Sequence, residues 1–176
     1  PELKAAIAAK TLRDSGFECA PSQVLVTNGG KHAVYTAFAA LCDPGDEVIC
    51  APYTFSASLL GVLYKGAMPV FADIDPLTYQ MDPAKVEAKI TPRTKAILPV
   101  HICGYATDME RIMEIARKHN LQVVEDVCQA HMTAIKGKNL GTFGTTGCFS
   151  FQTSKVMPIG EGGAILFTSR KPGRNV

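Results

Sequence analysis

Short apolar runs alternate along the chain with longer stretches of mixed polarity. Most of the apolar runs are continuous and rich in Val and Ile, which is typical of strands that are covered on both faces. We place seven strands, at Gln23–Thr27, Glu47–Ala51, Pro69–Ile74, Ala96–His101, Leu121–Glu125, Cys148–Gln152 and Ala164–Phe167. Strands separated in this way by helical stretches indicate βαβ units.

Helical patterns fill most of the intervals between these strands. We expect helices at Lys31–Leu41, Ser56–Lys65, Pro83–Lys89 and Asp108–His119. The last is the clearest, because either Thr107 or Asp108 can cap its start, Asn120 can end it, and it carries an apolar stripe of Met109, Ile112, Met113 and Ile115. The segment Ala134–Thr146 is the longest stretch that looks like a loop. The pattern predicts an α/β fold, with a mainly parallel sheet of about seven strands and helices on both faces.

Composition excludes several classes of protein. The 176 residues are 47% hydrophobic and 19% charged, which is enough to bury the core of one domain. A net charge of +2 does not favour a nucleic-acid partner. No apolar run reaches the roughly 20 residues of a membrane helix, and the first residues lack the apolar stretch of a signal peptide. We therefore expect no nucleic-acid or membrane partner.

Cysteine and histidine spacing bears on the cellular compartment and on metals. The six cysteines occur singly, without a C-x-x-C pair, as expected of reduced thiols in a cytoplasmic protein. His101 and His131 each follow a strand, but they have no metal-ligand spacing with each other or with a pair of carboxylates. The sequence therefore predicts a cytoplasmic protein without a metal site.

Candidate chemistry lies directly after the strands, because ligands of parallel α/β sheets gather at the carboxyl ends of the strands. Gly29, Gly30 and Lys31 stand between a strand and a helix. Backbone N–H groups and the helix N-terminus favour a phosphate there, although the glycines can equally serve the turn alone. This segment is a weak phosphate-site candidate by itself.

Three side chains at other strand ends also have two interpretations each. Asp126 is either a helix cap or a buried acceptor facing a cation. Lys155 is either a solvated charge or a desolvated amine that can form a Schiff base, and Phe55 is either core or an aromatic platform. Together with the phosphate segment, they are the parts needed to hold pyridoxal phosphate by its phosphate, ring face, ring nitrogen and aldehyde.

From about residue 47 to residue 169 the chain resembles the DegT/StrS family of sugar aminotransferases, which are fold type I pyridoxal-phosphate enzymes. The matching stretches are PYTFSAS, GAMPVFADID, ITPRTKAILPVH, VVEDVCQAH, GCFSFQTSK and GEGGAI. FSFQ-x-x-K followed by GEGGA looks most like the branch that acts on cyclitols. Met132 departs from the glycine that is usual at this point in the family.

The resemblance implies roles for individual residues. Lys155 would be the Schiff-base lysine, and Asp126 would be the partner of the pyridine nitrogen. Gln129 would lie near the phenolic oxygen of the cofactor, Ser150 would bind its phosphate, and Phe55 would take the stacking position. Some relatives that remove hydroxyl groups from sugars carry histidine in place of the lysine, so Lys155 favours amino transfer.

The first fifty residues resemble a different group of the same fold type, the aspartate aminotransferases. In that group TNGGKHA would be the phosphate loop, with contacts from Gly29, Gly30 and Lys31. The two resemblances meet near residues 50–53, which suggests a chimera or a designed chain. The substrate inference follows the longer segment.

The resemblance also implies an organisation and a function. Complete family members add a smaller C-terminal domain, so residues 1–176 would be a single cofactor-binding large domain without it, in a homodimer or higher oligomer. We expect a pyridoxal-phosphate-dependent aminotransferase that uses a small-molecule amino donor and a keto-sugar or ketocyclitol acceptor. The alternative is a non-catalytic truncated or engineered scaffold of the same fold. A nicotinamide dehydrogenase is disfavoured, because the glycine fingerprint after the first strand is missing.

Overall fold

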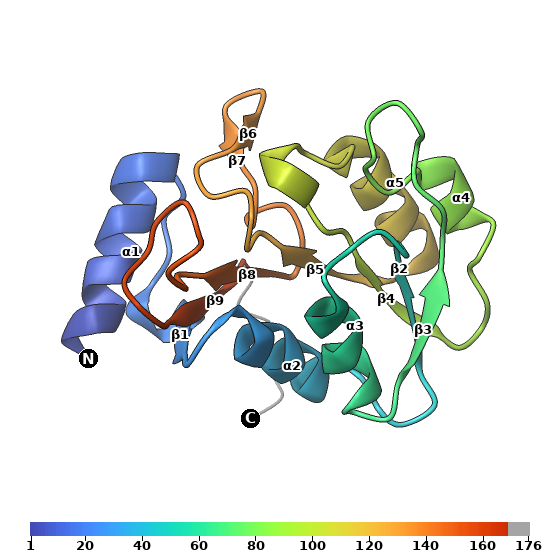
Figure 1. The fold of residues 1–176 in the computed structure, drawn as a ribbon, viewed down its shortest axis with the longest axis horizontal. Helices are drawn as coiled ribbons and strands as arrows, with labels where there is room; N and C mark the ends of the chain where they lie inside the picture. The colour runs from blue at the N-terminus through green and yellow to red at the C-terminus, as the bar shows by residue number, and fades with distance from the viewer. Residues whose placement is uncertain (169–176) are drawn as a thin grey trace.

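A seven-stranded sheet forms the centre of the computed structural model, which describes residues 1–168 (Figure 1). The strand order is β1-β9-β8-β5-β4-β2-β3. β9 runs antiparallel to β1 and β8, and the other neighbouring pairs are parallel. The strands are β1 (Val24–Thr27), β2 (Glu47–Cys50), β3 (Met68–Phe71), β4 (Thr94–Leu98), β5 (Gln122–Asp126), β8 (Thr146–Ser150) and β9 (Gly163–Phe167). The predicted mainly parallel sheet is confirmed.

Helices cover both faces of this sheet, as predicted. They are α1 (Glu2–Ser15), α2 (Gly30–Leu41), α3 (Ser56–Leu63), α4 (Pro83–Glu87) and α5 (Met109–His119), with 3-10 turns η1 (Pro21–Gln23) and η2 (Ile102–Gly104). One apolar cluster joins α2 and α3 to the sheet, and a second joins α4 and α5 to its other face. In Figure 1 α1 stands at the far end of the sheet, beside β1 and β9.

The apolar runs are continuous because neighbouring strand residues serve different clusters. Val48 and Ile49 of β2 are both fully buried, Val48 in the cluster under α2 and Ile49 in the cluster under α5. Successive side chains of a strand point to opposite faces, so a strand covered on both sides favours apolar residues at successive positions.

Helix α5 forms as its capping residues predict. Asp108 accepts a hydrogen bond from the backbone N–H of Arg111 at 3.1 Å, and Asn120 adopts the left-handed conformation with φ 53°. Ile112 and Ile115 of the apolar stripe are buried against the sheet. The capping residues and the apolar stripe thus predict the same helix.

Two features of the fold were not predicted. The first is α1, in a segment to which the pattern assigns no element. The second is a small hairpin, β6 (Ala134–Ile135) with β7 (Lys138–Asn139), inside the stretch expected to be a loop. Its turn residues Lys136 and Gly137 have φ of 50° and 81°, as a two-residue type I′ turn requires.

The third predicted strand, Pro69–Ile74, is shorter than expected, because Ile74 leaves the sheet and bridges to Met81.

None of the helices in residues 1–168 is long and apolar enough to cross a membrane. The same residues contain no group of three or more His, Cys, Asp or Glu side chains that could hold a metal ion.

Candidate active site

A cavity of about 580 Å³ opens at the carboxyl ends of the parallel strands, and we call it the strand-end cavity. This volume is typical of sites for small molecules and cofactors. All eight candidate residues lie in its wall: Gly29, Gly30, Lys31, Phe55, Asp126, Gln129, Ser150 and Lys155. They come from four separate parts of the chain, at the ends of β1, β2, β5 and β8. The fold therefore brings together the residues that the sequence singled out.

The wall is closely packed at the N-terminus of α2. Gly30 is the first residue of this helix, and Gly29 precedes it. A Cβ atom added to Gly30 would lie 2.6 Å from Sγ of Cys128 and 2.7 Å from Cβ of Ser150. Only glycine lets the helix start approach β5 and β8 so closely. The N–H groups of the first helical turn, which have no partner within the helix, thus lie at the cavity wall.

We expect Gly30→Ala to destabilise the protein and Gly29→Ala to have little effect. The methyl group added at position 30 would overlap two side chains, and overpacking of this kind costs about 1–3 kcal/mol. A Cβ on Gly29 would come no nearer than 3.9 Å to another group, Oε2 of Glu161, and the backbone there is extended. Urea denaturation of both variants measures the difference. Equal stability of the two would contradict the close packing at Gly30.

Asp126 ends β5 and is only 6% exposed. Its Oδ2 atom accepts a hydrogen bond from the hydroxyl of Ser58 at 2.7 Å, and Oδ1 accepts one from the backbone N–H of Cys128 at 3.1 Å. The next regular element after β5 is β6, so the helix-cap interpretation of Asp126 is wrong. The carboxylate is instead held in a fixed orientation at the wall of the strand-end cavity.

Gln129 and Phe55 line other parts of this wall. The side-chain Oε1 of Gln129 accepts a hydrogen bond from the backbone N–H of Cys103 at 3.0 Å, which leaves its NH₂ group as the donor available in the cavity. Phe55 is 60% exposed, so the interpretation of this ring as core is wrong. The Nζ atom of Lys31 lies 5.5 Å from the centroid of the Phe55 ring, within cation–π range.

Lys155 is half-buried in a turn that follows β8. Its backbone N–H donates to the carbonyl of Gln152 at 2.8 Å, and the side chain of Gln152 accepts from the backbone N–H of Ser154 at 2.9 Å. Within residues 1–168, Nζ of Lys155 forms no hydrogen bond or ion pair. The turn thus holds the lysine at the strand-end cavity with its amine uncommitted.

Sequence reasoning missed several residues of this wall, among them Ser58 and Cys128. Ser58 lies in the PYTFSAS stretch, but only the packing of α3 against the end of β5 shows that its hydroxyl serves Asp126. Burial raises the pKa of the Cys128 thiol well above its usual value. This thiol is therefore protonated near neutral pH and is no nucleophile.

A buried polar cluster lies behind the cavity, on the other side of β5. The carboxylate of Glu125, which is fully buried, accepts backbone N–H bonds from Gly141, Phe143 and Gly144 at 2.7–2.8 Å. His101, also fully buried, places Nε2 3.5 Å from Oε2 of Glu125. The glycine-rich stretch after residue 140 is thus anchored to β5 and lies outside the lining of the strand-end cavity.

We expect Glu125→Gln to destabilise the fold more than Glu114→Gln. The amide NH₂ would face backbone N–H donors, and a buried donor without an acceptor costs about 1–3 kcal/mol. Glu114 is exposed, on α5, and serves as the matched control. The free energy of unfolding in urea is the measurement. Equal unfolding midpoints for the two variants would contradict the anchoring role of Glu125.

Comparison with known proteins places this chain in a family. Residues 19–172 match the model of the DegT/DnrJ/EryC1/StrS aminotransferase family. The match runs without a break through residues 50–53, where the resemblances to two different groups meet. It also includes the glycines of the α2 N-terminus.

Individual relatives are similar over most of this chain. A UDP-N-acetyl-3-dehydro-alpha-D-glucosamine 3-aminotransferase of Acidithiobacillus ferrooxidans is 50% identical over 139 residues, which are 78% of this chain and 38% of that protein. An L-glutamine:2-deoxy-scyllo-inosose aminotransferase of Streptomyces kanamyceticus is 49% identical over 122 residues, which are 69% of this chain and 29% of that protein. The chain thus spans well under half the length of these relatives.

A solved structure extends the comparison to the fold. A protein described as a sugar aminotransferase from Streptococcus pneumoniae, in its PLP form, superposes with a TM-score of 0.87 at 26% identity. The superposition covers 97% of this chain and 46% of that one. Since the family model covers most of the sequence and the fold agrees, the chain belongs to the DegT/DnrJ/EryC1/StrS aminotransferase family.

Proposed function

We propose that this chain is the cofactor-binding part of a pyridoxal-phosphate-dependent aminotransferase that acts on a keto-sugar or ketocyclitol. The observation that carries the proposal is the pairing of an uncommitted amine, Lys155, with a buried and oriented carboxylate, Asp126, in the wall of one cavity. Membership of an aminotransferase family supports it.

The residues of the strand-end cavity fit pyridoxal phosphate. The N-terminus of α2 at Gly29–Lys31, with the buried hydroxyl of Ser150 beside it, would hold the phosphate group. The exposed ring of Phe55 would lie against the pyridine ring. Gln129 would donate its NH₂ group to the phenolic oxygen. Each of these groups is of the chemical type that its part of the cofactor requires.

When bound, pyridoxal phosphate supplies an aldehyde that amines can bind and a ring that accepts electrons from the substrate carbon. In the proposed reaction Asp126 keeps a proton on the ring nitrogen, because its carboxylate is fixed by Ser58 and Cys128. Lys155 would hold the cofactor, and its amine would serve as the base for the proton on the α-carbon of the amino donor. The half-buried turn around Lys155 keeps that amine close to the reacting atoms.

The substrates are proposed from the chemistry of the relatives. One relative named above carries a dehydro sugar in its name, and the other carries an inosose together with L-glutamine. A ring ketone is the acceptor group common to both, and a small amino acid is the donor. We therefore assign the acceptor to the class of keto-sugars and ketocyclitols.

The test of this function is optical. Purified protein mixed with pyridoxal phosphate should stay yellow after dialysis, and L-glutamine should discharge the colour as the amino group moves to the cofactor. Protein that binds the cofactor but keeps its colour with L-glutamine and L-glutamate would contradict amino transfer. Protein that stays colourless would favour the non-catalytic scaffold.

The proposal includes a compartment and a domain assignment. All six cysteines are free thiols, which suits a reducing cytoplasm. Residues 1–176 would act as one cofactor-binding domain. A single seven-stranded sheet connects the described residues, and the strand-end cavity is lined by residues that follow strands from both sides of this sheet.

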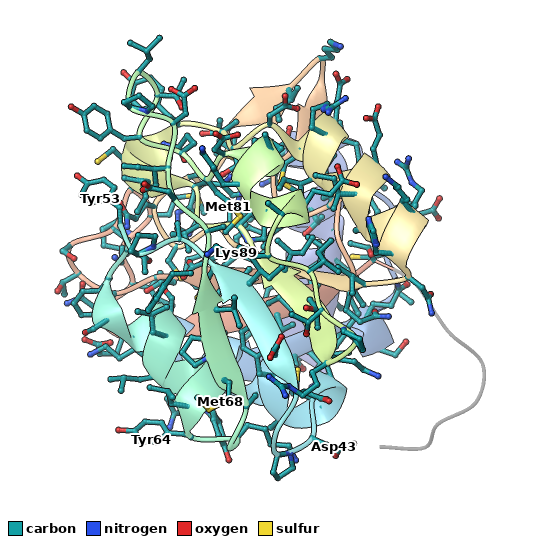
Figure 2. The ribbon with its side chains drawn as sticks, turned by 90° about the vertical axis from the view of Figure 1, so that its right-hand side faces the viewer. Asp43, Tyr53, Tyr64, Met68, Met81 and Lys89 are labelled. Atoms are coloured by element: carbon teal, nitrogen blue, oxygen red, sulfur yellow. The ribbon has the colours of Figure 1, made fainter. Side chains whose placement is uncertain are left out.

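We further propose a homodimer or higher oligomer. The last strand of the sheet, β3, and the adjacent helix α3 expose a set of apolar side chains that we call the β3 edge patch: Leu60, Leu63, Tyr64, Met68 and Phe71. Tyr64 and Met68 lie together at this edge in Figure 2. A contiguous apolar patch beside an unpaired strand edge is typical of an interface.

We expect light scattering to report a mass above that of one chain at concentrations well above micromolar. The variant Met68→Lys should lower this mass, because it places a charge in the β3 edge patch. Lys65→Met, a substitution next to the patch that adds apolar surface, should not lower it. A monomer mass for the unmodified protein would contradict the oligomer.

A further inference from the structure

A second cavity, of about 120 Å³, lies under helix α1, and we call it the α1 cavity. Its wall combines α1 with β8, β9 and the segment after β5. Most of the wall is apolar, including Ile7, Val24, Phe149 and Leu166. The α1 cavity and the strand-end cavity lie on opposite faces of β8, because Phe149 lines the first and its neighbour Ser150 lines the second.

Most polar groups in this wall already have partners. The hydroxyls of Thr11, Ser15 and Thr142 each donate to a backbone carbonyl oxygen. Lys10 and Asp14 form an ion pair with each other. The α1 cavity therefore offers little to a charged ligand.

His131 has no such partner. Its side chain is buried, with 8% of the residue exposed, and neither ring nitrogen forms a hydrogen bond with residues 1–168. The rings of Phe149 and Phe151 flank the imidazole, with centroids at 6.0 Å and 5.5 Å. Buried polar side chains are normally hydrogen-bonded, so an imidazole without a protein partner in a cavity wall can bind a ligand that supplies the hydrogen bond.

The protonation of His131 defines what it can recognise. Burial lowers the pKa of this imidazole, and the backbone of Ser150, which lies close to the ring but outside hydrogen-bond geometry, opposes the shift only in part. The ring is therefore neutral at pH 7, with one nitrogen that donates and one that accepts. A hydroxyl group can pair with either nitrogen.

We propose that the α1 cavity binds a small uncharged ring compound with a single hydroxyl group, of the phenol class, whose hydroxyl bonds to His131. The volume is close to that of an apolar protein cavity of about 150 Å³ that accepts benzene. The aromatic side chains around the imidazole suit a flat ring. This site is independent of the proposed aminotransferase function.

Phenol is the probe, and the imidazole signals of the four histidines are the readout. In protein labelled at histidine, a phenol titration followed by NMR should give a saturable shift at His131. The signals of exposed His32 and of His101, which is buried elsewhere, should stay in place. No saturable shift at His131 would mean that the cavity holds water only and would overturn the proposal. Equal shifts at all four histidines would overturn it as well.

Toluene, which has nearly the shape of phenol but no hydroxyl, tests the role of His131. We expect phenol to bind about tenfold more tightly than toluene, as the gain of one hydrogen bond predicts. In His131→Phe, which keeps a ring but removes both nitrogens, this preference should disappear in ligand-observed NMR. If the variant does not fold, the comparison in the unmodified protein decides, and equal affinities for the two compounds would overturn the proposal.

Discussion

Replacing Lys155 with alanine should abolish amino transfer and the covalent attachment of the cofactor, while leaving the fold unchanged. Nζ of Lys155 has no hydrogen-bond or ion-pair partner within residues 1–168, so its loss removes no internal contact of that kind. It does remove the amine that the proposed mechanism uses twice, to hold the aldehyde and to move the proton. A positioned group of this kind contributes about 10²–10⁴-fold through proton transfer alone.

The matched control for this variant is Lys31→Ala. Lys31 also lines the strand-end cavity, and its amine lies over Phe55, but the mechanism assigns it no proton transfer. We expect this control to weaken cofactor binding while some turnover remains. Turnover in Lys155→Ala equal to that of the unmodified protein would contradict the assignment of the lysine. Circular dichroism verifies that both variants are folded.

Replacing Asp126 with asparagine should weaken the binding of pyridoxal phosphate by one to two decades and suppress turnover. The carboxylate is 6% exposed and accepts two hydrogen bonds, so its charge is desolvated and fixed. Loss of one charge-assisted hydrogen bond to the ring nitrogen costs about 1.5–3 kcal/mol, or roughly ten- to a hundredfold in affinity. A fluorescence or absorbance titration with the cofactor measures the effect.

Two further variants separate the effect of the charge of Asp126 from the effect of the hydrogen bond that Ser58 donates to it. Asp43→Asn makes the same chemical change at an exposed position just before β2, whereas Tyr53 follows the opposite end of this strand (Figure 2). It should leave the affinity unchanged. Ser58→Ala removes only the hydroxyl that donates to Asp126, so we expect a smaller loss than for Asp126→Asn. Equal affinity of Asp126→Asn and Asp43→Asn would show that the charge of Asp126 has no role.

The sheet and the candidate residues of the site could be predicted, because both follow from the local sequence pattern and from a general rule of sheet topology. Continuous apolar runs such as residues 47–51 mark strands covered on both faces. Residues that follow parallel strands must share one edge of the sheet, which is why Gly30, Asp126 and Lys155 reach one cavity.

The partners of these residues were not predictable, since they depend on how distant segments pack. The hydroxyl of Ser58 reaches Asp126 across 68 positions of sequence, and nothing in the pattern of α3 specifies that contact. The role of Glu125 depends on the path of residues 141–144, which have no periodic pattern. Helix α1 escaped prediction because its large apolar residues do not share one face: Leu3 and Leu12 are exposed, and only Ala8 is buried.

The most direct test of the central claim is to find where borohydride fixes pyridoxal phosphate on the unmodified protein. An exposed lysine near its usual pKa of about 10.4 is almost wholly protonated at pH 7 and reacts poorly with aldehydes. Lys155 lies half-buried in the wall of the proposed cofactor site, so a bound cofactor gives its amine a high local concentration of aldehyde.

Trypsin does not cleave after a modified lysine. The proposed mechanism therefore predicts that mass spectrometry will find residues 139–170 as one labelled peptide, in place of the separate peptides 139–155 and 156–170. The other lysines should remain largely unlabelled. Label distributed evenly over the lysines, with peptides 139–155 and 156–170 recovered intact, would contradict the assignment of Lys155 and with it the proposed aminotransferase activity.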